Sequence, residues 1–420
     1  MRAVLDDLDA ALFAFVACYP LWSSLLWTGF ALRFGRSSLS RSGARSLEEL
    51  AAARARFPLV SVVVPAHNEE ALIQGTLERV LALRWPTLDV LVVNDGSADG
   101  TLAAVRPYVL DGRVRLLRKR DNEGKALAID DALRLALGEI VLILDADGAP
   151  QADVLERMVP HFVRVPAVGA VTGSPRVDNA STLLGKLQAI EFASTVSILR
   201  RGHAAWGRVN TFSGLCTAVR RDAVAAAGGY RPDMITEDIA MTWALQLGGW
   251  EVLYEPAALF AMQVPESLPA WWRQRRRWSI GLGQVLRRYG RRALLPRHWR
   301  MWPILAQDIL AILWVHALLA ALALGAVSLA AGSGVGDFVP GVLAVTTAVA
   351  GLLQVVVGVR MDARHDPGIA RLVWFAPLYP LAYWLMSAAA AVRGTVPGLV
   401  RAPRVETWNI PRVAREQIAS

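Results

Sequence analysis

Four long apolar stretches limit how this chain can fold more than any other feature of its sequence. They cover residues 12–34, 302–331, 338–359 and 372–392. As a helix, each is long enough to cross about 30 Å of hydrocarbon. Charged residues still make up 19% of the 420 residues, more than a protein built only of membrane helices carries. The sequence therefore predicts a soluble domain, residues 58–265, flanked by membrane helices.

The charges around the first stretch indicate how it is oriented. Acidic residues precede it at positions 6, 7 and 9, and arginines lie at its end or follow it at positions 33, 36, 41 and 45. A cleaved signal peptide has the opposite charge order and a small-residue cleavage site. We therefore expect a short N-terminal segment, residues 1–11, and a retained transmembrane helix. Because arginine marks the cytoplasmic side, the linker 35–57 and the soluble domain are expected in the cytoplasm.

The C-terminal stretches, within residues 301–393, are expected to be three transmembrane or re-entrant helices. The connection at 360–371 carries three arginines, which is typical of a cytoplasmic loop. Pro377 and Pro380 interrupt the last stretch, so a re-entrant segment stays open there. For the basic tail, residues 394–420, the number of predicted spans indicates a location outside the cytoplasm, whereas its positive charge indicates the cytoplasm. The sequence does not decide between these two locations.

The middle of the chain alternates strand-like and helix-like patterns. Apolar runs predict strands at "LVSVVVPA", "LDVLVVNDGS", "VRLLR", "EIVLILDAD" and "VGAVTG". Helical periodicity separates the first four at residues 70–83, 98–105 and 123–137, and Pro107 is expected to stop the second helix. Unbroken apolar runs are typical of strands buried on both faces. The predicted fold class is therefore α/β, with a mostly parallel, Rossmann-like sheet.

Polar residues follow three of these predicted strands, at residues 65–69, at 94–97, and at Asp145 and Asp147. In a parallel sheet these positions meet at the edge where ligands bind. Asp145 and Asp147 share one face, where like charges repel, so a divalent metal between them is one hypothesis and a solvated acidic turn is the other. No dinucleotide fingerprint or P-loop pattern occurs, which disfavours a dehydrogenase and a P-loop kinase.

Two further motifs lie downstream. Thr236, Glu237 and Asp238 stand at a predicted helix start, where Thr236 or Asp238 is either a simple helix cap or part of a site. Residues 266–300 are expected to form an interfacial amphipathic region, because ten arginines and no acidic residue lie between positions 272 and 300. That region contains a Q-x-x-R-W pattern.

In order along the chain, "NDGS", "DAD", "TED" and "QRRRW" resemble the processive family 2 glycosyltransferases, which include the cellulose, chitin, hyaluronan and poly-N-acetylglucosamine synthases. The segments "DMITEDIAMTWALQLGGWEVLYEPAAL" and "TWNIPR" are most similar to the bacterial poly-β-1,6-N-acetylglucosamine synthases. The resemblance implies a GT-A-like domain in a multi-pass protein of the bacterial inner membrane. It also implies an inverting enzyme that polymerises N-acetylglucosamine from UDP-N-acetylglucosamine into a biofilm polysaccharide and translocates the product.

The resemblance also implies roles for particular residues. Asp238 is expected to be the catalytic base, with Glu237 beside it. Asp147 is expected to bind Mg²⁺ or Mn²⁺, and Asp145 to touch the metal or the ribose. The residues expected to bind the nucleotide sugar are Pro65, Glu69, Asp95, Lys125, Asp145, Gln274 and Arg277. Trp278 is expected to stack on the acceptor sugar.

Alternative functions stay open at this point. They are a synthase of another β-glycan, a transferase that adds one sugar to a lipid, and a transporter with a nucleotide-sensing domain. The expected partners are the UDP-sugar donor, the growing polysaccharide acceptor and membrane lipids, with room for a small membrane partner subunit. Nucleic acid is not expected as a partner, because the arginines between 272 and 300 adjoin an apolar stretch and are interleaved with tryptophans.

Overall fold

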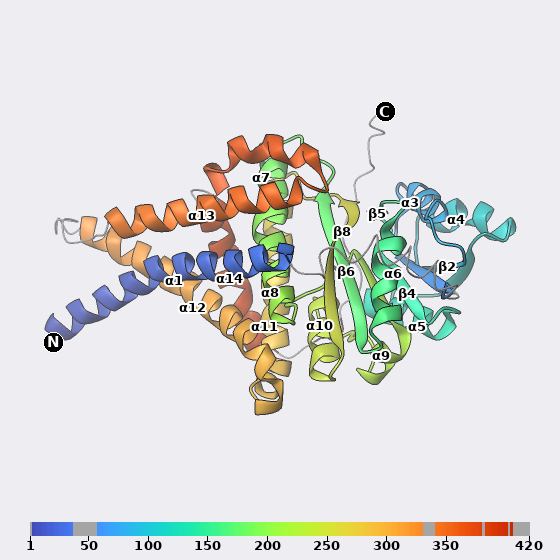
Figure 1. Cartoon of the computed structure of the whole chain (residues 1–420), viewed down its shortest axis with the longest axis horizontal. Helices are drawn as coiled ribbons and strands as arrows, with labels where there is room; N and C mark the ends of the chain where they lie inside the picture. Colours follow the sequence, from blue (N-terminus) through green and yellow to red (C-terminus); the bar gives the residue numbers. More distant parts are fainter. Residues whose placement is uncertain (1, 37–56, 331–340, 380–382, 402–403, 406–420) are drawn as a thin grey trace. The chain divides into compact units, whose positions relative to one another are not determined.

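The computed structural model of the protein describes residues 2–36, 57–330, 341–379, 383–401 and 404–405 (Figure 1). The chain divides into two compact units. The sheet unit comprises residues 34–179, 207–264 and 402–420, and the helical unit comprises residues 1–33, 180–206 and 265–401. Residues 180–206 therefore belong with the helical unit, although they lie inside the predicted domain at 58–265.

The sheet unit contains an eight-stranded sheet in the order β3-β2-β1-β4-β7-β6-β8-β5. The strands are β1 (Val60–Ala66), β2 (Leu88–Asp95), β3 (Arg115–Lys119), β4 (Ile140–Leu144), β5 (Ala149–Pro150), β6 (Val168–Val177), β7 (Cys216–Arg220) and β8 (Glu251–Met262). β3, β2, β1 and β4 are parallel neighbours, as are β6 and β8. The expected mostly parallel α/β sheet is confirmed, with antiparallel pairs at β4–β7, β6–β7 and β5–β8.

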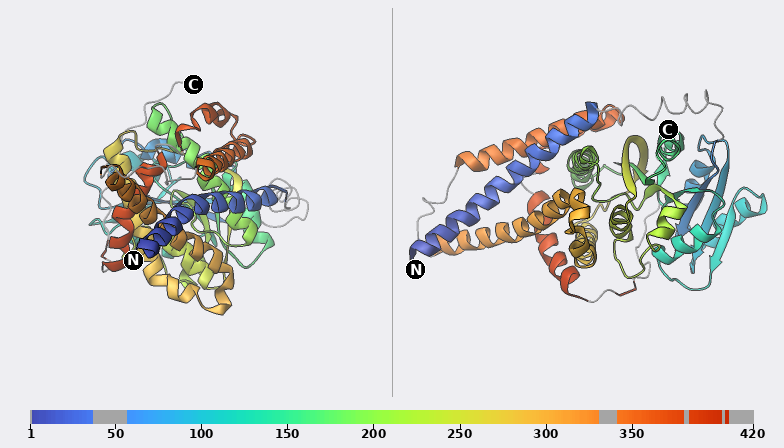
Figure 2. Two further views of the ribbon diagram at one scale, coloured as in Figure 1. Left: turned by 90° about the vertical axis from the view of Figure 1, so that its left-hand side faces the viewer. Right: turned by 60° about the horizontal axis from the view of Figure 1, so that its bottom comes forward.

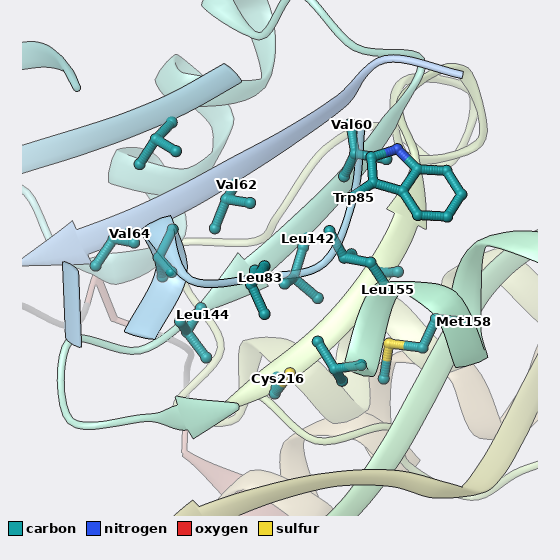
Figure 3. Close-up of a cluster of buried hydrophobic side chains, with 14 of the residues drawn as sticks. Val60, Val62, Val64, Leu83, Trp85, Leu142, Leu144, Leu155, Met158 and Cys216 are labelled. Carbon is teal, nitrogen blue, oxygen red and sulfur yellow. The ribbon is translucent and has the colours of Figure 1, made fainter. Parts of the chain in front are cut away.

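Apolar side chains on both faces of the central strands explain why these segments form a sheet. Every residue of β1 and of β4 is buried. Val60, Val62 and Val64 alternate along β1 and therefore share one face, where they join a cluster with Leu142 and Leu144 of β4 (Figure 3). The central strands are thus buried on both sides, and their polar residues are left to their ends.

The helices of the sheet unit connect these strands. They are α3 (Ile73–Leu81), α4 (Thr101–Leu110), α5 (Lys125–Leu135), α6 (Val154–Arg164), α9 (Arg221–Ala226) and α10 (Glu237–Leu247). The expectation that Pro107 stops its helix is wrong, since α4 continues through Pro107 to Leu110. Proline removes one backbone donor, but its fixed φ is compatible with a helix, so a short final turn can follow.

The helical unit consists mainly of long helices. These are α1 (Arg2–Arg36), α7 (Leu183–Glu191), the π-helix η2 (Phe192–Val196), α8 (Ser197–Trp206), α11 (Leu268–Ala293), the 3₁₀-helix η3 (Pro296–Met301), α12 (Trp302–Ala330), α13 (Gly341–Asp362), the 3₁₀-helix η5 (Pro367–Phe375) and α14 (Trp384–Val400). Helix α1 runs alongside α12 and α13 (Figure 2), and side-chain hydrogen bonds join it to both. Trp314 of α12 donates to the carbonyl of Val16, and Thr347 of α13 donates to that of Ala17.

Two helical segments in the described part of the chain are long and apolar enough to cross a membrane, Ala11–Gly35 and Pro296–Val327. They overlap the first and second of the four predicted stretches. The fourth stretch, residues 372–392, is not a single helix, because η5 ends at Phe375 and α14 begins at Trp384. Pro377, which lies shortly after η5, has no backbone N–H with which to continue a helix. Most of the C-terminal tail lies outside the described residues.

Helices α11 and α14 pack with their backbones in direct contact, because glycines leave no side chain between them. A Cβ atom at Gly398 would lie 2.1 Å from the carbonyl oxygen of Ile280, and one at Gly283 would lie 2.6 Å from that of Thr395. Small residues that let helix backbones approach closely are characteristic of helix pairs in membranes. This contact fixes α11 against α14.

Gly398→Ala should therefore destabilise the helical unit by about 1–3 kcal/mol, the usual cost of overpacking a filled contact. Gly290→Ala is the matched control, because a Cβ atom there meets nothing within 4 Å. It should raise stability by about 0.5–1 kcal/mol through helix propensity. Thermal unfolding of the purified full-length variants in detergent measures both effects, and equal midpoints for the two variants would contradict the close contact.

Candidate functional site

Polar residues from several strand ends meet at one edge of the sheet unit. β1 lies between β2 and β4, and all three are parallel. Their carboxyl ends therefore lie together, and the polar residues at 65–69, 94–97 and 145–147 follow them, as the sequence led us to expect. The expected site residues that end or follow strands β1, β2 and β4 lie at this edge: Pro65, Glu69, Asp95, Asp145 and Asp147.

Lys125, the first residue of α5, lies at the centre of this edge. Its Nζ atom is 2.7 Å from Oδ1 of Asp145 and 3.1 Å from Oε1 of Glu237. Burial by itself lowers the pKa of the Lys125 ammonium, but the carboxylates of Asp145 and Glu237 outweigh it and hold that pKa above its usual value. Lys125 is therefore charged at neutral pH and joins the D-x-D motif to the T-E-D motif.

Gly214 connects this ion group to Asp238 through its backbone. Its carbonyl oxygen accepts a hydrogen bond from Nζ of Lys125 at 2.9 Å, and its N–H donates to Oδ2 of Asp238 at 3.1 Å. A Cβ atom at Gly214 would lie 3.0 Å from that carboxylate oxygen, so a larger residue would press against the expected base. Sequence reasoning missed Gly214, and its only signal was a Ser-Gly pair, which is typical of many turns.

The T-E-D motif lies at the start of α10. Thr236 occupies the N-cap position, but its side chain makes no capping hydrogen bond. The carboxylate of Asp238 instead accepts from the backbone N–H groups of Gly214 and Ile239. A small cavity is lined by Glu237 and Asp238 together with Phe212, Ser213, Gly214, Thr217, Tyr230, Ile129 and Ile143. The simple-cap interpretation therefore does not fit Thr236, and Asp238 faces a cavity.

Tyr230 is a second residue of this cavity that sequence reasoning missed. Burial raises the pKa of its hydroxyl well above the usual range, and the carboxylate of Glu237 raises it further. The hydroxyl therefore stays protonated at any physiological pH. Its backbone N–H donates to Oδ1 of Asp130, which anchors the tyrosine to α5.

Asp95, expected to bind the nucleotide, holds a loop in this structure. Its buried carboxylate accepts from the N–H of Glu123 at 3.1 Å and from that of Gly124 at 2.8 Å. These bonds explain why α5 begins at Lys125, two residues later than the sequence suggested. Burial raises the pKa of Asp95, although both N–H groups counter it. A contact between Asp95 and a nucleotide stays a prediction.

His67 frames the same corner of the edge. Its Nδ1 atom lies 2.6 Å from the carbonyl oxygen of Asp95, and its Nε2 atom lies 3.1 Å from Nδ2 of Asn122. Glu69, two residues further, is buried, and its N–H donates to Oγ1 of Thr101 at 2.8 Å. The turn after β1 is thus bonded to the segments that follow β2 and β3.

Pro65, the remaining expected nucleotide contact in this unit, lies near the end of β1, where it pairs with Val93 of β2. The ladder to β4 covers only residues 60–63 of β1. A proline, which cannot donate a ladder hydrogen bond, is therefore tolerated at this position. Its own contact with a ligand stays a prediction.

Asp145 and Asp147 offer carboxylate oxygens, the donors that Mg²⁺ and Mn²⁺ prefer. The structure places Asp145 against Lys125 and leaves Asp147 buried at the same edge. Within the described ranges, no three His, Cys, Asp or Glu residues are grouped to hold a metal by themselves. Magnesium sites commonly combine one or two protein carboxylates with substrate phosphates, so this donor set fits a metal that shares its ligands with a diphosphate.

The Q-x-x-R-W residues lie on α11 in the helical unit. Arg277 is exposed, and Gln274 and Trp278 are half-buried. The side chain of Arg275, between them in sequence, lies against the ring of Trp278, with its Cζ atom 4.4 Å from the ring centroid. The motif therefore places the exposed guanidinium of Arg277 and the indole of Trp278, which Arg275 contacts, on one helix.

Comparison with known proteins gives consistent results. The sequence model of a family described as "glycosyltransferase like family 2" matches residues 58–281. The poly-beta-1,6-N-acetyl-D-glucosamine synthase of Staphylococcus epidermidis is 30% identical over 95% of this chain and 98% of its own length. The enzyme of the same name from Staphylococcus aureus is 31% identical, with the same coverage of both chains.

The fold is also found in a solved structure of another glycosyltransferase. The mannosyltransferase PcManGT from Pyrobaculum calidifontis, solved in complex with GDP-Man and Mn²⁺, is 23% identical. The two structures superpose with a TM-score of 0.58, and the alignment covers 87% of this chain and 98% of the mannosyltransferase chain. The expected GT-A-like architecture is supported by this likeness.

The ion group around Lys125 makes a stability prediction. Lys125→Met should lower the free energy of unfolding by about 3 kcal/mol, because it leaves Asp145 and Glu237 close together without their shared cation. Arg134→Met on the same helix is the control, since that side chain is 78% exposed and its pair with Asp131 spans 3.7 Å. Its loss should cost less than about 1 kcal/mol. Thermal unfolding of purified variants compares them, and equal small losses would refute the bridging role.

Proposed function

Because this chain belongs to glycosyltransferase family 2, we propose that it polymerises N-acetylglucosamine from UDP-N-acetylglucosamine into a β-1,6-linked polysaccharide. The choice of sugar and linkage follows the relatives named as synthases of this polymer, which align with nearly the whole chain. The observation that carries the chemistry is the linked group of Lys125, Asp145, Glu237 and Asp238 at the carboxyl edge of the sheet.

The proposed reaction is a single displacement at the anomeric carbon. An acceptor hydroxyl oxygen forms a bond to that carbon, the bond to the UDP oxygen breaks, and its electron pair leaves with the diphosphate. Asp238 accepts the proton of the attacking hydroxyl. The N–H groups of Gly214 and Ile239 fix the orientation of the Asp238 carboxylate at the cavity, so the base is aimed before substrate arrives.

Glu237 and Lys125 support this base without taking its proton. Glu237 is adjacent to Asp238 and is paired with Lys125, whose charge offsets the repulsion between the neighbouring carboxylates. In the proposal, Glu237 holds the ammonium in place, and the ammonium holds the Gly214 carbonyl. The same peptide segment then presents the Gly214 N–H to Asp238.

The leaving diphosphate needs positive charge nearby. A bound Mg²⁺ or Mn²⁺ supplies charge neutralisation there without proton transfer. Asp147, with Asp145 beside it, would hold that ion, and Pro65, Glu69 and Asp95 would contact the nucleotide. The exposed guanidinium of Arg277 would bind the pyrophosphate as a two-pronged donor, with Gln274 on the same helix. Trp278 would carry the acceptor sugar on its ring.

We propose that the protein is a multi-pass membrane enzyme with its sheet unit in the cytoplasm, where UDP-sugars are made, and that it passes its product across the membrane. The two long apolar helices support membrane insertion, and the arginines after residue 33 support the orientation. Membrane lipids would surround these helices. A small partner subunit stays a prediction from the family resemblance.

The base assignment can be separated from nucleotide binding by one nearly isosteric change. Asp238→Asn should reduce turnover by about 10² or more, the usual scale of a general base, while affinity for UDP-N-acetylglucosamine changes little. Asp222→Asn, an exposed residue at the start of α9, serves as the control. Polymer formation and ligand binding are measured on the same purified samples. If binding and turnover were lost together, Asp238 would be a nucleotide ligand.

The metal assignment predicts that chelation stops the reaction. EDTA should abolish polymer formation from UDP-N-acetylglucosamine, and added Mg²⁺ or Mn²⁺ should restore it. Asp147→Ala should reduce the rate of polymer formation by at least about 10²-fold, even with excess Mg²⁺ or Mn²⁺, because one of the few protein ligands of the ion is gone. Asp222→Ala should behave as the wild type. Full activity in EDTA would overturn the metal role of Asp147.

A further inference from the structure

Arg275 differs from the other arginines of the Q-R-R-R-W segment because it is buried. Its exposed fraction is 8%, whereas Arg273, Arg276 and Arg277 are exposed. Its Nη1 and Nη2 atoms donate to the two carboxylate oxygens of Glu191 on α7, at 3.1 and 2.6 Å. This two-pronged geometry fixes the plane of the guanidinium as well as its position.

Tyr383 completes the support of this ion pair. Its hydroxyl donates to Oε2 of Glu191 at 2.8 Å and accepts from Nη2 of Arg275 at 2.9 Å. The indole N–H of Trp271 also donates to that hydroxyl at 2.9 Å. Burying a charged pair is costly unless further polar contacts offset the lost hydration, and the Tyr383 hydroxyl contacts both members of this pair. We call Glu191, Arg275 and Tyr383 the clamp.

The clamp holds its guanidinium against Trp278. The Cζ atom of Arg275 lies 4.4 Å from the centroid of the Trp278 ring, closer than to the rings of Trp271 at 5.7 Å or Tyr383 at 5.8 Å. A cation over an indole face is attracted by the ring's negative π-surface. Trp278 is one turn of helix beyond Arg275 and is half-buried, so one face is held while part of the ring stays accessible.

The clamp is built on irregular backbone. Glu191 immediately precedes the π-helix η2, and Thr195 within η2 bonds the hydroxyl of Tyr379 at 2.8 Å. Tyr379 stacks on Tyr383, with centroids 5.3 Å apart and an interplanar angle of 24°. Gly358 of α13 admits this wide turn, because a Cβ atom there would lie 2.6 Å from Cα of Ser194. Single π-turns within helices are frequent at functional sites.

We propose that Arg275 is a positioning residue of the acceptor site, which fixes the Trp278 ring so that its accessible surface is ready to stack on a sugar. This inference rests on the proposed function, in which Trp278 carries the acceptor. Fixing the indole before the acceptor arrives removes an ordering cost from binding. Arg275 acts through Trp278 and touches neither the donor nor the reacting atoms.

The test uses the full-length protein in membranes, with a β-1,6-linked N-acetylglucosamine oligosaccharide as added acceptor. Arg275→Gln should raise the KM for this acceptor about tenfold, the lower end of the effect of losing one stacking platform. The KM for UDP-N-acetylglucosamine and the kcat at saturating acceptor should stay within about twofold. Arg276→Gln, the exposed neighbour, should leave all three parameters unchanged.

Because Arg275→Gln alone leaves a buried Glu191 unpaired, two further variants protect the test against misfolding. The pair Glu191→Gln with Arg275→Gln removes both charges, and Tyr383→Phe removes one hydroxyl. Both should raise the acceptor KM without raising the donor KM, and the rise should be smaller for Tyr383→Phe. Folded variants with an unchanged acceptor KM, or with an equal rise in donor KM, would overturn the proposal.

A double-mutant cycle shows whether Arg275 acts through the indole. Added to Trp278→Ala, the change Arg275→Gln should raise the acceptor KM no further, since residues that act as a unit are not additive. Independent, multiplied increases would overturn the positioning role. Wild-type membranes that make no polymer from UDP-N-acetylglucosamine would overturn the proposed function, and the inference with it. A wild type that does polymerise, with no selective effect of Arg275→Gln, would overturn the inference alone.

Discussion

The ammonium of Lys125 is the charge on which the polar edge of the sheet unit depends. It comes from the start of α5 and bonds Asp145 after β4, Glu237 at the start of α10, and the Gly214 carbonyl before β7. These segments are far apart in sequence, and two of them bring carboxylates that repel each other. One cation offsets that repulsion. Asp95 sets the position of this cation, because its carboxylate holds the loop that leads into α5.

The sequence predicted this edge well because it follows from a simple pattern. Apolar runs that end in polar residues predict buried parallel strands, and parallel strands bring those ends together. The partners of each side chain could not be predicted in the same way. Nucleotide binding by Lys125 and Asp95 stays a prediction. What the sequence did not indicate is that Lys125 pairs with Asp145 and Glu237 and that Asp95 accepts from backbone N–H groups. Gly214 contributes only backbone atoms, which carry no sequence signature of their own.

Helix boundaries were harder to predict because packing and loop contacts decide them. α4 continues past Pro107, and the apolar stretch at 372–392 divides between η5 and α14, although its composition suits a single span. Residues 180–206 belong with the helical unit in spite of their position between two parts of the sheet unit. Among ten arginines between 272 and 300, only tertiary contacts single out Arg275, since its neighbours have the same side chain.

The glycine contact between α11 and α14 has a mechanical consequence. At Gly283 of α11 and at Gly398 of α14, the backbone of the opposite helix occupies the space that a side chain would need. If either helix slid along the other, its neighbouring side chains would collide with that backbone. Close-packed surfaces of this kind resist gradual sliding. The two helices are therefore expected to move together as one rigid body along the length over which they pack. The Q-x-x-R-W residues lie on α11. If α11 shifted along its axis, α14 would shift with it, so any such movement of the motif would involve both helices.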